Sequence, residues 1–161
     1  MRKAIFIDRD GVINDDTKEY YIHRIENFSL NPGVVSALKF LQGKGYLLIV
    51  VSNQGGISKG LYSKEDVDRL HQYMTEILER EGIIITDIFY CPHHDEVENC
   101  LCRKPKPLML QKAMARYRID PGQSFFIGDK QSDVEAGRNA GIRTILIKPN
   151  SNLEKVLERI N

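Results

Sequence analysis

A short apolar run that leads directly into two acidic residues opens the chain: Ala4-Ile5-Phe6-Ile7-Asp8-Arg9-Asp10-Gly11. Consecutive apolar residues without alternation are typical of a strand buried on both faces of a parallel sheet. Asp8 and Asp10 stand two residues apart, so both carboxylates point the same way if the backbone stays extended, and Gly11 permits a turn after them. The stretch therefore predicts an acidic site at the carboxyl end of a buried strand.

Further apolar runs alternate with amphipathic stretches along the rest of the chain. We expect strands at residues 4–7, 47–51, 84–90, 124–127 and 144–147. Between them, helices are expected from Asn31-Pro32 to the glycines at 43 and 45, from a capping Ser63 to Gly82, over 107–117 and over 132–139, with a last amphipathic segment at 153–160. This alternation predicts an α/β fold, a single doubly wound and mainly parallel sheet flanked by helices, in one domain spanning residues 1–161.

Composition excludes several classes of function. A chain of 161 residues with 42% hydrophobic and 28% charged residues suits a globular domain, and the net charge of +1 gives no general reason to bind nucleic acid. The longest purely apolar stretch, Tyr46 to Val51, is far shorter than the ~20 residues that span a bilayer, and from the residues at the start of the chain we expect no secretory signal. We expect a cytoplasmic monomer that has neither nucleic-acid nor membrane partners.

Polar residues follow the expected strands where each strand ends. Ser52-Asn53-Gln54 follow the second strand, Gly128-Asp129-Lys130 follow the fourth, and Asp133 comes one helical turn later. Ligands of open parallel sheets bind at this edge. Converging carboxylates repel one another unless a hard cation such as Mg²⁺ lies between them, and Mg²⁺ commonly takes a phosphate oxygen too. Ser52, Lys104 and Lys130 are suited to bind that phosphate.

A compact group of soft ligands lies between residues 91 and 102. Cys91, Cys100 and Cys102, together with His93 or His94, make up the Cys₃His set of a structural zinc site. Four protein ligands leave no open position for water, so this zinc would be structural. It would hold a polar loop in one shape and direct Arg103 and Lys104 toward the acidic site.

Taken together, these motifs resemble those of the haloacid dehalogenase (HAD) superfamily of phosphatases, over roughly residues 4–147. Within it, Asp8-Arg9-Asp10-Gly11, Asn53-Gln54, Cys91-Pro92-His93-His94 and Cys102-Arg103-Lys104-Pro105 are similar to the D-glycero-D-manno-heptose 1,7-bisphosphate phosphatases and the histidinol-phosphate phosphatases. The stretches at 21–28, 56–60 and 128–130 look more like the heptose enzymes. The resemblance also favours His93 over His94 as the zinc ligand.

The resemblance implies a role for each catalytic residue. Asp8 would attack phosphorus and form an aspartyl-phosphate, and Asp10 would act as the acid and then the base. Mg²⁺ would bind the Asp8 side chain, the Asp10 carbonyl and Asp129, with Asp133 in indirect contact. Ser52 would donate a hydrogen bond to the phosphoryl oxygens, Lys104 would supply positive charge to them in the transition state, and Lys130 would hold the acidic groups together.

Substrate recognition is expected to fall to three loops, because the predicted elements leave no room for a cap domain. These loops cover residues 15–24, residues 54–60 and the zinc loop ending at Arg103. Residues expected to bind substrate are Arg9, Tyr21, Asn53, Gln54, Arg103 and Lys130. His23 and His71 are expected on the solvated surface. A phospho-accepting signalling module is the alternative of another class, although an acid/base two residues from the nucleophile would hydrolyse its acyl phosphate.

Overall fold

Five parallel strands form one sheet in this computed structural model, which describes residues 1–160. Their order across the sheet is β3-β2-β1-β4-β5, with β1 in the centre. The strands are β1 (Ala4–Ile7), β2 (Leu47–Asn53), β3 (Asp87–Cys91), β4 (Phe125–Gly128) and β5 (Arg143–Leu146). Successive strands are added on one side of β1 for β2 and β3 and on the other side for β4 and β5, and all pairs are parallel, which confirms the doubly wound parallel fold.

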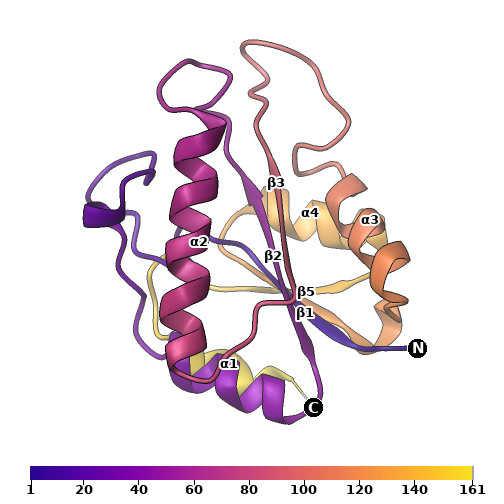
Figure 1. Cartoon of the computed structure of the whole chain (residues 1–161). Coiled ribbons are helices and arrows are strands. Elements are labelled where there is room, and N and C mark those ends of the chain that lie inside the picture. The colour runs from indigo at the N-terminus through magenta and orange to yellow at the C-terminus, as the bar shows by residue number, and fades with distance from the viewer. Residues whose placement is uncertain (161) are drawn as a thin grey trace.

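Helices cover both faces of this sheet (Figure 1). They are α1 (Val34–Gly43), α2 (Lys64–Arg80), α3 (Leu108–Tyr117) and α4 (Gln131–Ala140), with short 3₁₀ helices η1 (Ile25–Asn27), η2 (Pro121–Gln123) and η3 (Leu153–Arg159). α1, α2 and η3 contribute to one hydrophobic cluster, and α3 and α4 contribute to the other. The sheet therefore separates two cores.

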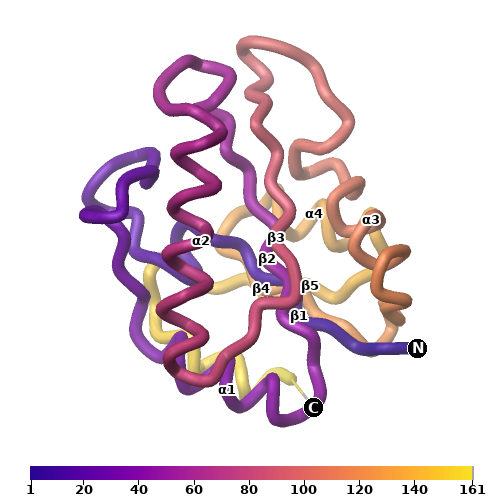
Figure 2. Tube along the Cα trace, viewed as in Figure 1, coloured from indigo at the N-terminus to yellow at the C-terminus, as the bar shows by residue number. Residues whose placement is uncertain are grey.

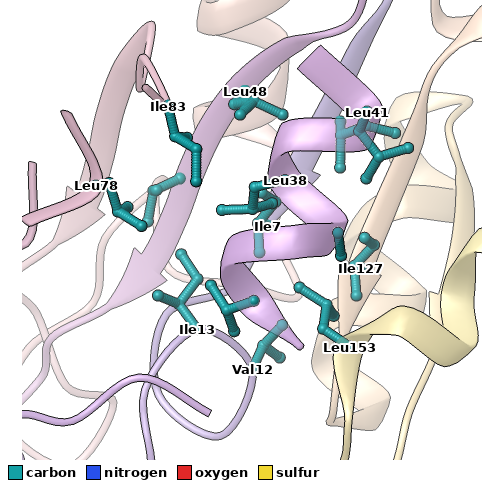
Figure 3. Packing of buried hydrophobic residues seen from close by; sticks show 14 of the residues in the cluster. Ile7, Val12, Ile13, Leu38, Leu41, Leu48, Leu78, Ile83, Ile127 and Leu153 are labelled. Carbon is teal, nitrogen blue, oxygen red and sulfur yellow. The ribbon is translucent and has the colours of Figure 1, made fainter. Parts of the chain in front are cut away.

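Alternation along the central strand produces this division. Ile5 and Ile7 face the first cluster, while Ala4 and Phe6 face the second, and all four are fully buried. Figure 3 shows Ile7 among the apolar side chains of the first cluster, near Leu38 of α1. Burying a side chain of this size contributes roughly 1.5–3 kcal/mol, so the two cores hold β1 and the residues that follow it in place.

The long helix α2 begins as its sequence predicts. The Ser63 hydroxyl accepts from the Asp66 backbone N–H at 3.0 Å, and the Asp66 carboxylate accepts from the Ser63 N–H at 2.9 Å. This reciprocal pair satisfies two of the backbone donors that a helix start leaves free. The cap therefore accounts for the start of α2 directly after Ser63.

Two elements, α1 and β3, begin two or more residues later than the sequence predicts. α1 begins at Val34 after Gly33, whose positive φ of 77° forms the cap, because the Asn31 side chain is used elsewhere. It donates to the Val12 carbonyl at 3.2 Å, so Asn31-Pro32 precedes the helix without capping it. β3 begins at Asp87, three residues later than expected, and Ile84 is 66% exposed.

The strands deliver their carboxyl ends to one edge of the sheet. Ile7 of β1 pairs with Val50 of β2 and Ile127 of β4, and the Asp8 N–H donates to the Ile127 carbonyl at 3.0 Å. The loops after β2 and β3 extend beyond this edge, at the top of Figure 2. Within the described residues no cap domain is inserted over the edge, and none of the helices has the length and apolar character that crossing a membrane requires.

Candidate active site

A buried ion-pair network surrounds Asp8, the first residue after β1. The Lys104 ammonium lies 3.0 Å from Asp8 Oδ1, 2.7 Å from Asp133 Oδ1 and 3.0 Å from the Val51 carbonyl. Burial and the Asp133 charge raise the pKa of Asp8 well above its usual value, and Lys104 partly offsets them. Burial also disfavours the charged form of Lys104, but the two carboxylates outweigh it and raise its pKa, so the lysine is a cation.

Three carboxylates of this edge can share one cation. Asp8, Asp129 and Asp133 each offer an oxygen, and these atoms lie within 4.8 Å of one another. Asp129 Oδ1 is buried without a hydrogen-bond partner in the described part of the chain, and burial raises the pKa of this carboxyl. A bound cation would stabilise a buried carboxylate oxygen that has no hydrogen-bond donor, and oxygen ligands suit Mg²⁺. The donor set therefore fits the predicted metal.

Asp133 is already engaged by protein groups. Its Oδ2 accepts from the backbone N–H groups of Asp129 at 3.1 Å and Lys130 at 3.2 Å, and its Oδ1 accepts from Lys104. Asp8 and Asp129 thus remain the freer ligands, in keeping with an indirect role for Asp133. The backbone approaches closely here, because a Cβ on Gly11, whose φ is +83°, would lie 2.3 Å from Asp129 Oδ2.

Asp10 directs its carboxylate toward a different set of donors. Arg9 donates from Nε at 3.1 Å and from Nη2 at 2.9 and 3.1 Å, Asn14 Nδ2 donates at 3.0 Å, and Gln54 Nε2 donates at 3.0 Å. Burial would raise the pKa of Asp10, but Arg9 and these hydrogen bonds outweigh burial and lower it. The free protein consequently holds Asp10 as a carboxylate.

An open cleft of about 360 Å³ lies over these groups. Four of the residues expected to bind substrate line it: Tyr21, Asn53, Arg103 and Lys130. The Arg103 guanidinium is held by the His93 carbonyl at 3.0 Å and Asp95 at 3.7 Å, while the Lys130 ammonium is 4.0 Å from Asp129. Other lining residues were not singled out from the sequence, namely Asp16, Tyr20, Asp95 and Ser132. Each falls within or beside a segment that carried a predicted site residue.

Asn53 joins the end of β2 to the segment that carries the buried lysine. Its Nδ2 donates to the Lys104 carbonyl at 3.2 Å, and its Oδ1 accepts from the Lys104 N–H at 3.0 Å. Both hydrogen-bonding groups of the Lys104 backbone are therefore fixed by one amide. This pair positions the lysine backbone relative to β2.

The cysteine and histidine group predicted from the sequence comes together in the loop after β3. Cys91, His93, Cys100 and Cys102 place their ligand atoms within 4.8 Å of one another. The sulfurs of Cys91 and Cys100 are 3.7 Å apart, close to the ~3.8 Å edge of a tetrahedron with Zn–S bonds of about 2.3 Å. Cys102 Sγ is only 2.7 Å from Cys91 Sγ, so a bound zinc ion requires this pair to separate.

His93, and not His94, belongs to this group. His93 Nδ1 lies 3.4 Å from Cys91 Sγ and 3.3 Å from Cys102 Sγ, and its other ring nitrogen is 3.9 Å from Glu98. A carboxylate on the far ring nitrogen is common for metal-binding histidines. Burial opposes ionisation of Cys100, but backbone N–H groups outweigh it and lower its pKa to about 7. The group fits a structural zinc ion.

Comparison with known proteins places the chain in a family. Residues 101–161 match the Hydrolase_like family model, which is described as HAD-hydrolase-like. The D-glycero-beta-D-manno-heptose-1,7-bisphosphate 7-phosphatase of Pasteurella multocida is 44% identical, over 92% of this chain and 83% of that protein. The chain belongs to the heptose-bisphosphate phosphatase family of HAD hydrolases. It is a phosphatase, as its HAD motifs predict.

Other members of the family support this placement. The D-glycero-alpha-D-manno-heptose-1,7-bisphosphate 7-phosphatase of Campylobacter jejuni is 42% identical, over 90% of this chain and 81% of that protein. A crystal structure of the D,D-heptose 1,7-bisphosphate phosphatase from B. bronchiseptica, complexed with magnesium and phosphate, superposes with a TM-score of 0.85. It is 30% identical and covers 98% of this chain and 86% of that one.

Two residues of this phosphatase that were expected to bind substrate lie beneath the cleft instead. Arg9 is fully buried, and its Nη2 also donates to the Ile22 carbonyl at 2.5 Å. Gln54 is 2% exposed; its Nε2 also donates to Ser52 at 2.8 Å, and its Oε1 accepts from Tyr62 at 2.8 Å. Neither side chain lines the cleft, and both hold the Asp10 carboxylate.

The expectation that His71 is solvated is wrong. It is 5% exposed, and its Nε2 lies 3.0 Å from Arg9 Nη1. The sequence carried a signal that was missed, because residue 71 falls on the same helical stripe as the buried residues of α2, which are Val67, Leu70, Met74 and Leu78. His23 is partly buried, with its ring stacked on Tyr62 at 4.8 Å.

Proposed function

We propose that this phosphatase removes the phosphate at carbon 7 of a D-glycero-D-manno-heptose 1,7-bisphosphate, in the synthesis of nucleotide-activated heptose. One observation carries the proposal: Asp8 meets Lys104 at 3.0 Å and shares a cation-binding group with Asp129 directly below an open cleft that contains Arg103. Relatives named for this reaction at 40–44% identity support the substrate class.

The first chemical step is proposed to occur at Asp8. Its free carboxylate oxygen forms a bond to phosphorus, and the bond from phosphorus to the sugar oxygen breaks. Ser52 would donate a hydrogen bond to the phosphoryl oxygens, and Lys104 would supply positive charge to them in the transition state. A Mg²⁺ ion held by Asp8, the backbone carbonyl of Asp10 and Asp129 would supply positive charge that offsets the charge of the phosphoryl group.

Asp10 is proposed to handle the proton in both steps. Arg9 keeps it ionised in the free protein, so the proton it delivers must be taken up with the substrate, whose phosphate charge raises the pKa of a nearby carboxyl. That proton goes to the departing sugar oxygen. In the second step Asp10 removes a proton from water, which attacks phosphorus and breaks its bond to Asp8.

Recognition of the sugar is proposed to rest on the exposed side of the cleft. Arg103 presents a planar guanidinium that suits a second phosphate, and Tyr21, Asn53 and Lys130 line the path between it and Asp8. Asp16 and Tyr20 extend this surface and offer a carboxylate and a phenol to hydroxyl groups. An open cleft of this size suits a small sugar.

The zinc ion is also a proposal, as are the setting and the assembly of the protein. Zinc bound by Cys91, His93, Cys100 and Cys102 would hold the loop that carries Arg103 and Lys104. Thiols of this kind are kept reduced in the cytoplasm, where we propose that the phosphatase works as a monomer without nucleic-acid or membrane partners. Elemental analysis, cell fractionation and analytical ultracentrifugation test these statements in turn.

A kinetic panel tests the substrate. Phosphate release is measured with the alpha and beta anomers of the heptose 1,7-bisphosphate and with histidinol phosphate, and phosphorus NMR identifies which phosphate remains on the sugar. We expect kcat/KM to be highest for one of the heptose anomers, with the 1-phosphate retained. A higher kcat/KM for histidinol phosphate would refute the substrate assignment. A phosphoprotein that persists for minutes would favour a signalling module instead.

A further inference from the structure

A buried polar chain runs from α2 to the acid/base residue of the site. His71 Nε2 lies 3.0 Å from Arg9 Nη1, and the same guanidinium reaches both Asp10 oxygens through Nε and Nη2. Arg9 is fully buried and His71 is 5% exposed. These hydrogen-bonded side chains therefore connect Asp10 to α2, a helix that begins far from β1 in the sequence.

Chemistry fixes the direction of the contact between His71 and Arg9. A guanidinium has donors only, so the imidazole Nε2 must be the acceptor and cannot carry a proton. Burial and then the Arg9 charge lower the pKa of His71 to about 3, which keeps the ring neutral. The groups that face the ring are Arg9 and Asp10 from the segment after β1, and Tyr90 of β3, whose ring meets it edge-on at 5.4 Å.

Each nitrogen of the Arg9 guanidinium has at least one acceptor. Nε and Nη2 bind Asp10, Nη2 also binds the Ile22 carbonyl, and Nη1 binds His71. Because the guanidinium is planar, fixing Nη1 and Nη2 on two sides fixes its rotation. His71 is the only acceptor that the described residues supply to Nη1. Without it, the guanidinium can turn away from Asp10 to satisfy that donor.

We propose that His71 is a positioning residue for phosphoryl transfer: by accepting from Arg9 it sets the orientation of the guanidinium and, through it, the place of the Asp10 carboxyl group. The inference rests on the proposed acid/base role of Asp10 and extends it to α2. An apolar side chain at position 71 would continue the buried stripe of α2. A histidine there is explained by its bond to Arg9.

Three substitutions separate positioning from packing. His71→Gln keeps an acceptor near the position of Nε2, His71→Asn keeps a polar amide that is too short to reach Arg9, and His71→Leu removes the acceptor. Met74→Ala is the matched control, because Met74 is fully buried one turn further along α2 and belongs to the core. All four variants are compared with wild type in thermal unfolding and in kinetics with the best sugar phosphate.

The expected result is a split between kcat and KM. A displaced acid/base group lowers kcat by about 10- to 100-fold, so we expect this loss in His71→Leu and His71→Asn, with KM changed less than about threefold. His71→Gln should retain kcat within about threefold of wild type. Met74→Ala should lower the melting temperature without this loss of kcat.

A change of leaving group adds a second readout. In single-turnover formation of the phosphoenzyme, an aryl phosphate releases a phenolate that needs no proton, whereas a sugar phosphate needs the proton from Asp10. The deficit of His71→Asn should therefore be at least several-fold smaller with the aryl ester. Wild-type kcat in His71→Asn, an equal deficit with both esters, or equal losses in the Gln and Asn variants would overturn the proposal. If wild type hydrolyses simple sugar phosphates but not the heptose bisphosphate, the substrate assignment fails and this test still applies.

Discussion

Replacing Lys104 with methionine removes the one positive charge buried between Asp8 and Asp133. At 3.0 and 2.7 Å and an effective dielectric constant of about 20, the two pairs each correspond to roughly 6 kcal/mol of gross Coulomb attraction. Desolvation of the lysine offsets much of this attraction. Breaking a buried pair by removing one partner costs about 3–5 kcal/mol, because the remaining charges stay buried. We expect Lys104→Met to lower the free energy of unfolding of the metal-free protein by that amount.

The loss should grow as the pH rises. Burial and Asp133 already raise the pKa of Asp8 in the folded protein, and removing Lys104 raises it further. The folded variant then holds a proton that the unfolded chain releases above about pH 4. Stability therefore falls with increasing pH, by at most about 1.4 kcal/mol per pH unit for each such proton.

Urea denaturation with EDTA at pH 5, 6.5 and 8 measures both effects. Lys130→Met is the matched control, because its ammonium is 4.0 Å from Asp129 and its side chain is 58% exposed. We expect this control to change stability by less than about 1 kcal/mol. The reasoning is refuted if Lys104→Met is no less stable than Lys130→Met, or if its stability does not fall from pH 5 to pH 8.

Three further substitutions test the site. Asp8→Asn should reduce turnover by at least about 10³-fold, since an amide cannot act as the nucleophile; radiolabelled substrate should no longer label the protein, and retained labelling would point to another nucleophile. The Cys100→Ser variant should contain no zinc in elemental analysis and should melt at a lower temperature than wild type. A metal-free wild type that is as stable as the zinc-loaded protein would argue against the zinc site. Gly11→Ala should weaken Mg²⁺ binding in calorimetry, because the new Cβ would lie 2.3 Å from Asp129 Oδ2; unchanged affinity would contradict that geometry.

Much of the site could be predicted because its residues are tied to strand ends. Asp8 and Asp129 follow buried runs whose parallel pairing brings their ends together, and residues 4–7 form a strand with the predicted bounds. The cysteine cluster is similarly local, since all its members lie between Cys91 and Cys102. Short-range sequence patterns are enough to locate features of this kind.

The orientation of the remaining side chains depends on contacts between distant segments. Arg9 and Gln54 follow the ends of strands, so the sequence alone predicts that their side chains face a ligand. His71, 62 residues away, binds Arg9, and Gln54 donates to Asp10, 44 residues away. No local pattern encodes these partners. The burial of His71 itself could have been read from its place on the apolar stripe of α2.

The amide of Asn53 has a consequence for how such enzymes diversify. The Asn53 amide binds the backbone of Lys104 and no side chain of the preceding loop. These two hydrogen bonds therefore do not depend on which side chains that loop carries. Insertions or exchanges among residues 94–99, which lie between the zinc-ligand candidates His93 and Cys100, would then change the rim of the cleft while the ammonium keeps its location beside the nucleophile. Specificity and chemistry can thus change independently over evolutionary time, although one short loop carries both.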